Sequence, residues 1–144
     1  MNELSIIRLE QNFSVSEEFI WQYLTSLSHM KNWWFSQIRS FEPKLGFKTR
    51  FTVSHEGEKY VHLWEVLEVI PQEKLVLDWR YDNHSGRAYA KFELRATSQG
   101  TQLIFTSDVL AFFPNKKVFS RANMSQGWKK LLLEQLPKYV EKIN

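Results

Sequence analysis

Two histidines on either side of a short Glu-Gly turn are the nearest that this sequence comes to a metal site. His55 and His62 bracket Glu56-Gly57, and Glu58 follows the turn directly. Imidazole nitrogens and carboxylate oxygens are common zinc ligands, but a site needs three or four of them held in a fixed, convergent geometry. Nothing in this spacing fixes such a geometry. We therefore expect no metal site and no cofactor.

Several charged or hydroxyl-bearing residues lie within otherwise apolar segments and are candidates for acid–base chemistry: Glu65, Asp78, Arg80, Arg87, Tyr89 and Asp108. An inward pair, such as Glu65 or Asp108 with Arg80 or Tyr89, could move a proton in a cyclase-type reaction. Strand residues alternate between two faces, however, so each side chain can equally point to solvent. An outward Glu65–Arg80 pair would contribute less than about 1 kcal/mol. We favour the outward orientation and assign no catalytic residue.

Other signatures of catalysis are missing. The sequence has no G-x-S-x-G nucleophile turn, no G-x-x-x-x-G-K-[ST] phosphate loop and no dinucleotide-binding glycine pattern. It also has no cysteine, which excludes disulfides, thiol nucleophiles and cysteine-bound zinc. These absences exclude the common nucleotide-dependent and thiol-dependent enzyme classes.

Aromatic residues are unusually frequent, with six Trp, five Tyr and eleven Phe. Large flat side chains fill protein cores, and they also line pockets for apolar or ring-bearing ligands. The pair Phe112-Phe113, just before Pro114, is our candidate for a gate at the mouth of such a pocket. The other candidate wall residues are Trp64, Trp79, Phe92, Phe105, Met124, Trp128, Leu132 and Tyr139.

A long amphipathic helix at the end of the chain is the element best placed to cover a pocket. From Trp128 to Ile143, apolar residues recur at intervals of three and four, which is the spacing of one helical face. We expect the helix to begin between Asn115 and Ser125. Pro137 lacks the N–H that would bond to Leu133, so we expect a kink there and not an end.

The segments before this helix predict an antiparallel sheet. A first strand from about Leu4 to Phe13 precedes one or two short helices that begin at Ser14 or Ser16 and end near Met30. About six further extended segments follow, with turn signals at Glu56-Gly57, Pro71 and Gln99-Gly100. They begin with a strand around Gln37 to Glu42. If Ile70 pairs with Leu75 across the Pro71 turn, Glu65 faces Arg80.

The fold class is therefore α+β: one curved antiparallel sheet of about six or seven strands, wrapped around a long terminal helix. The 144 residues fit one domain, 1–144. No apolar run is long enough to cross a bilayer and no export signal opens the chain, so we expect a cytoplasmic protein without membrane insertion. The net charge is +3, but the lysines after Trp128 lie opposite the apolar stripe of the helix. We expect no nucleic-acid partner.

The chain also resembles a known family through the stretch Trp64-Glu65-Val66-Leu67-Glu68-Val69-Ile70-Pro71, followed by Leu75, Trp79, Gly100-Thr101 and Gly127-Trp128 with Leu131 and Leu132. It is similar to homologues of the activator of the ninety-kilodalton heat-shock-protein ATPase, within the START-like (SRPBCC) superfamily of helix-grip folds. The resemblance covers essentially the whole chain. It implies a deep cavity between sheet and terminal helix, used across the superfamily for lipids, polyketides, hormones or other apolar molecules.

Three functional hypotheses follow. The leading one is a non-enzymatic carrier or sensor that encloses a small apolar ligand, lipid-like or polycyclic, under the terminal helix. A second is a protein-interaction module that modulates a chaperone ATPase, which predicts a contiguous exposed patch instead of a cavity. The third, a polyketide-type cyclase, requires an inward acid–base pair.

Overall fold

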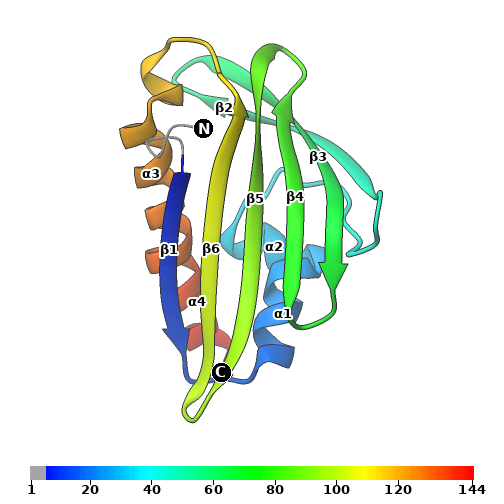
Figure 1. Ribbon diagram of the computed structural model, residues 1–144, viewed down its shortest axis with the longest axis vertical. Coiled ribbons are helices and arrows are strands. Elements are labelled where there is room, and N and C mark those ends of the chain that lie inside the picture. Colours follow the sequence, from blue (N-terminus) through cyan, green and yellow to red (C-terminus); the bar gives the residue numbers. More distant parts are fainter. Residues whose placement is uncertain (1–5) are drawn as a thin grey trace.

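In the computed structural model, which describes residues 6–144, one six-stranded antiparallel sheet is covered on one face by helices (Figure 1). The spatial order of its strands is β1-β6-β5-β4-β3-β2. The strands are β1 (Ile6–Phe13), β2 (Lys48–His55), β3 (Glu58–Ile70), β4 (Lys74–Tyr81), β5 (His84–Thr97) and β6 (Gly100–Ala111). The predicted curved antiparallel sheet is confirmed. The predicted start of the first strand, at Leu4, lies outside the described residues.

Two short helices follow the first strand, as predicted, and a longer helical segment ends the chain. They are α1 (Glu17–Thr25) and α2 (Leu27–Trp33) near the start, then a single turn η2 (Lys117–Phe119), α3 (Arg121–Lys129), the π-helical η3 (Lys130–Gln135) and α4 (Leu136–Ile143). From Arg121 to Ile143 the last three form one continuous helix that runs behind the sheet (Figure 1). Ser120 caps it by accepting a bond from the backbone N–H of Asn123 at 3.2 Å. The start lies within the predicted window.

The terminal helix continues through Pro137, as expected. The π-helical turn η3 lies just before Pro137. The kink that we expected at Pro137 stays a prediction. There the N–H of Leu136 bonds to the carbonyl of Leu131, five residues back instead of four. A widened turn of this kind is one of the few known ways to insert an irregularity into a helix without ending it.

The pairing of β3 with β4 differs from our prediction by one residue. Ile70 pairs with Lys74, and the register then shifts at Leu67, which bulges between Val66 and Glu68. A bulge places one extra residue on one strand and changes every later pairing. Glu65 therefore lies opposite Asp78, and the predicted Glu65–Arg80 pair is wrong.

The predicted strand around Gln37 to Glu42 is also wrong, because these residues form no strand in the structure. Ile38 and Phe41 are both buried, but they are three residues apart, a spacing that does not fit the two-residue repeat of a strand. The N–H of Ile38 instead closes a turn onto the carbonyl of Phe35. The segment packs as an irregular connection.

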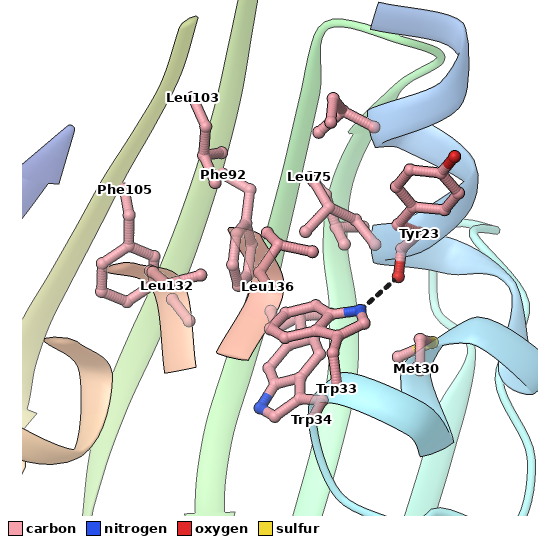
Figure 2. Close-up of a cluster of buried hydrophobic side chains, with 14 of the residues drawn as sticks. Tyr23, Met30, Trp33, Trp34, Leu75, Phe92, Leu103, Phe105, Leu132 and Leu136 are labelled. Carbon is pink, nitrogen blue, oxygen red and sulfur yellow. Dashed lines mark hydrogen bonds between the residues drawn. The ribbon is translucent and has the colours of Figure 1, made fainter. Parts of the chain in front are cut away.

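One part of the space between sheet and helices is filled with aromatic and aliphatic side chains (Figure 2). Trp33 stacks on Trp34 with ring centroids 5.0 Å apart, and its Nε1 donates to the carbonyl of Tyr23 at 2.7 Å, the dashed line in Figure 2. Phe92 and Leu136, also in this cluster, have no exposed surface. This part of the interior leaves no room for a ligand.

Candidate functional site

A cavity of about 290 Å³ lies on the inner face of the sheet, under α3 and η2. Small residues explain why space remains there. Ala88 and Ala90 on β5 face inward with only a methyl group each, and Gly127 on α3 has no side chain. Gly127 follows Met124 by three residues and precedes Leu131 by four, so all three share the helical face that borders the cavity. Aromatic rings form most of the remaining wall: Phe35, Tyr60, Trp79, Tyr81, Phe113, Phe119 and Trp128.

His62 is a buried polar residue of this cavity, and Ser107 is another. The exposed fraction of His62 is 4%, and its ring stacks on Phe51 with centroids 4.7 Å apart. Its Nδ1 lies 3.1 Å from the carbonyl oxygen of Tyr60. Burial lowers the pKa of His62 from 6.5 to about 4, because the surrounding rings cannot solvate an imidazolium, and the bond to Tyr60 only partly opposes this. The imidazole is therefore neutral at pH 7.

Tyr81 lies directly opposite His62 on the neighbouring strand, with ring centroids 4.8 Å apart in an edge-to-face arrangement. Its hydroxyl oxygen accepts a hydrogen bond from Nε1 of Trp79 at 3.0 Å. Burial raises the pKa of Tyr81 above its ordinary value of 10, so the phenol keeps its proton at physiological pH. The cavity thus holds a neutral imidazole beside a neutral phenol.

A salt bridge ties the segment after β6 to the sheet near the cavity. Lys116 Nζ lies 3.0 Å from a Glu58 oxygen, and the Tyr60 hydroxyl donates to the other oxygen at 2.8 Å. The bonds from Lys116 and Tyr60 lower the pKa of Glu58, while burial and the bond to Glu58 raise the pKa of Tyr60 to about 12. Both groups keep their ordinary charge at pH 7.

The structure brings four of the ten candidate wall residues together around the cavity: Trp79, Phe113, Met124 and Trp128. Four others lie in the packed part of the core: Trp64, Phe92, Phe105 and Leu132. Tyr139 lies away from the cavity, where its hydroxyl is 2.5 Å from Nδ1 of His29. In the proposed gate, Phe113 lines the cavity, whereas Phe112 points outward and is 85% exposed.

Sequence reasoning missed His62 and Tyr81 as cavity residues, although a signal for them was present. His62 is two residues from Trp64, and Tyr81 is two residues from Trp79, so each shares the strand face of a tryptophan. Both tryptophans point inward. If the strand faces that carry Trp64 and Trp79 are both assigned to the interior, His62 and Tyr81 are also predicted to point inward.

Of the candidates for acid–base chemistry, Tyr89 is among the residues that line the cavity, whereas Glu65, Asp78, Arg80, Arg87 and Asp108 are not and lie on the other face of the sheet, the orientation that we favoured. Asp78 is 3% exposed there, with Arg80 Nε at 3.1 Å and Arg87 Nε at 2.5 Å from its oxygens. Next along the same row, the Tyr89 hydroxyl donates to Asp108 at 3.4 Å. The cavity therefore receives none of these carboxylates.

Within residues 6–144, no three His, Asp or Glu side chains are grouped so that they could hold a metal ion. His55 and His62, the pair considered from sequence, differ in environment, because His55 is exposed and His62 is buried. Over the same residues, no helix is long and apolar enough to cross a membrane.

The model of one protein family, described as "Activator of Hsp90 ATPase homolog 1-like protein", matches residues 14–141. The chain belongs to this family. The family's name refers to a chaperone ATPase, and the antiparallel sheet with its long C-terminal helix is consistent with the helix-grip fold. The comparison with curated proteins found no match.

Solved structures of bacterial proteins share this fold at low sequence identity. Protein CV1439 from Chromobacterium violaceum is 19% identical with a TM-score of 0.79, over 95% of this chain and 97% of that one. Protein MLL2253 from Mesorhizobium loti is 23% identical with a TM-score of 0.78, over 96% and 98%. Mll3558 from Rhizobium loti is 18% identical with a TM-score of 0.82, over 94% and 96%. At these identities the likeness shows the fold alone.

Proposed function

We propose that this protein binds a small apolar, ring-bearing molecule in the cavity under α3 and acts as a non-enzymatic carrier or sensor. The observation that carries the proposal is the aromatic-walled space of about 290 Å³. A cavity of about 150 Å³ holds one benzene molecule, and ligand pockets range upward from about 300 Å³. The space suits a molecule of about two fused rings.

Burial of the ligand's apolar surface would drive binding. At about 25 cal/mol per Å², a few hundred Å² of buried ligand surface gives several kcal/mol, from which the cost of association is subtracted. Micromolar affinity is the expected range. The exposed His55 and Asn123 border the same cavity, so it has a route to solvent on that side.

The first experiment asks whether the purified protein carries a ligand. Mass spectrometry of its organic extract identifies any co-purified molecule, and titration with naphthalene, fatty acids, sterols and flavonoids follows tryptophan fluorescence. Trp79 and Trp128 line the cavity, so a bound molecule alters their emission. A co-purified apolar molecule or a saturable change supports the proposal. No ligand and no saturable change would overturn it.

A matched pair of variants links any signal to the cavity. Gly127→Leu adds a side chain on the cavity face of α3, where a Cβ meets no atom within 4 Å. Gln126→Leu adds the same side chain at the neighbouring exposed position. We expect binding to weaken at least tenfold in Gly127→Leu and to stay unchanged in Gln126→Leu. Equal binding by both variants would place the ligand elsewhere.

The two other hypotheses have less support. A chaperone-binding module predicts a contiguous apolar patch, but the large exposed apolar side chains of the described residues are spread over many elements, from Phe19 on α1 to Ile143 on α4. A cyclase of the type considered from sequence needs its acid–base pair inside the cavity, and of Glu65, Asp108, Arg80 and Tyr89 only Tyr89 is among the residues that line it. Assays of chaperone ATP turnover and of ligand turnover test the two directly.

A further inference from the structure

The tautomer of His62 follows from its single hydrogen bond. The carbonyl oxygen of Tyr60 can only accept, so the His62 Nδ1 at 3.1 Å must carry the proton and donate. In a neutral ring the other nitrogen, Nε2, then carries a lone pair and is an acceptor. The carbonyl of Tyr60 thus makes Nε2 of this buried ring a hydrogen-bond acceptor.

That acceptor is unused within the protein. Among the described residues, Nε2 of His62 has no hydrogen-bond partner. The fully enclosed polar side-chain atoms without a partner are Nε1 of Trp34, Nε1 of Trp64 and Nε2 of His84, and His62 Nε2 is not one of them. Because His62 is 4% exposed and lines the cavity, its accessible nitrogen opens into that space.

Tyr81 supplies the complementary group. Its oxygen already accepts from Trp79 Nε1 at 3.0 Å, so its O–H points elsewhere, and no acceptor for it lies within the described part of the chain. His62 and Tyr81 are direct cross-strand partners, with ring centroids 4.8 Å apart. A free acceptor and a free donor therefore belong to two neighbouring rings of the cavity wall.

We propose that the ligand is a hydroxylated aromatic molecule, whose hydroxyl group donates to His62 Nε2 and accepts from the O–H of Tyr81. This inference rests on the proposed function, since it assigns the ligand class of the same cavity. A hydroxyl is the smallest group that both donates and accepts, and it satisfies both unused groups at once. An apolar ligand of the same shape would displace water from both and leave them unpaired, which weakens its binding.

The protonation state of His62 agrees with this assignment. Burial lowers the pKa of His62 to about 4, so the acceptor lone pair is present throughout the physiological pH range. The burial that raises the pKa of Tyr81 likewise keeps its donor proton in place. Neither group carries a charge that would favour an ionic ligand.

Three bicyclic probes test the proposal by equilibrium dialysis with the wild-type protein at pH 7. Naphthalene has no polar group, 2-methoxynaphthalene has an oxygen acceptor without a donor, and 2-naphthol has both. We expect 2-naphthol to bind about three- to tenfold more tightly than either of the others, as one or two net hydrogen bonds predict. Equal affinity for 2-naphthol and 2-methoxynaphthalene would overturn the proposal without any variant.

Variants then assign the preference to residues. His62→Phe removes the acceptor and should abolish the preference for 2-naphthol over naphthalene while naphthalene still binds. His62→Gln keeps one donor and one acceptor and should retain the preference. His29→Gln, at a histidine that does not line the cavity, is the control and should bind the three probes as the wild type does. A preference that survives in a folded His62→Phe variant would refute the role of His62.

The outcomes separate this inference from the proposed function. If none of the three probes binds and no ligand is extracted, the cavity is not a binding site and the proposed function fails. If all three bind equally, the cavity binds apolar molecules and only the assignment of a hydroxylated ligand fails. Thermal unfolding followed by circular dichroism confirms that each variant is folded.

Discussion

Lowering the pH should destabilise this protein through His62, by an amount that follows from its burial. Its pKa is lowered from 6.5 to about 4 in the folded state. Between these two values the unfolded chain binds a proton that the folded protein does not, so the free energy of unfolding falls as the pH falls. At about 1.36 kcal/mol per pH unit, the loss amounts to about 3 kcal/mol between pH 6.5 and pH 4. Above pH 6.5 the contribution of His62 is constant.

Urea unfolding at a series of pH values from 7.5 to 4 measures this loss. Carboxylates also titrate in this range, so the free energy of unfolding of the wild type is compared at each pH with that of His62→Gln. This variant has no titrating group at position 62. We expect the wild type to lose about 3 kcal/mol more than His62→Gln over this range. His55→Gln removes an exposed histidine and should follow the wild type. Parallel curves for wild type and His62→Gln would refute the reasoning.

Three further predictions concern stability and are measured by thermal or urea unfolding. Gly127→Ala should stabilise the protein by about 1 kcal/mol, because alanine is the better helix former and its Cβ meets no atom within 4 Å; a loss of stability would contradict the open space at this position. Gly86→Ala should cost about 1–3 kcal/mol from overpacking against Phe113, in addition to the strain at a φ of 108°. Gly46→Ala is the control for Gly86→Ala, because Gly46 has a φ of 82° but an added Cβ would meet no atom within 4 Å. It should lose less stability than Gly86→Ala. Leu132→Ala should cost about 2–5 kcal/mol because the side chain is 1% exposed, and the same truncation at the 37% exposed Leu133 should cost much less.

The architecture was predictable because its signals are local and repeated. The apolar residues between Trp128 and Ile143 required a helix, and the turns at Glu56-Gly57 and Gln99-Gly100 required hairpins. The register of β3 against β4 was not predictable, since the bulge at Leu67 depends on tertiary packing and leaves no mark in the alternation of residues.

The candidate site was predictable only in part. Trp79 and Trp128 were identified as wall residues by their size, but size cannot distinguish a wall residue from a core residue such as Phe92. The cavity lies where Ala88, Ala90 and Gly127 border it with little or no side chain. Counting aromatic residues in the sequence does not reveal such a space, because small residues create it. His62 and Tyr81 were missed because the face of each strand was left unassigned.

The π-helical turn η3 divides the terminal helix at an informative place. Before it, Met124 borders the cavity and Trp128 borders both the cavity and the solid core; after it, Leu136 and Val140 belong to the core and do not line the cavity. One widened turn rotates α4 about the helix axis relative to α3. The direction in which the side chains of α3 point therefore does not determine the direction in which those of α4 point. Substitutions in α3 can therefore reshape the wall of the cavity while α4 keeps its packing against the core.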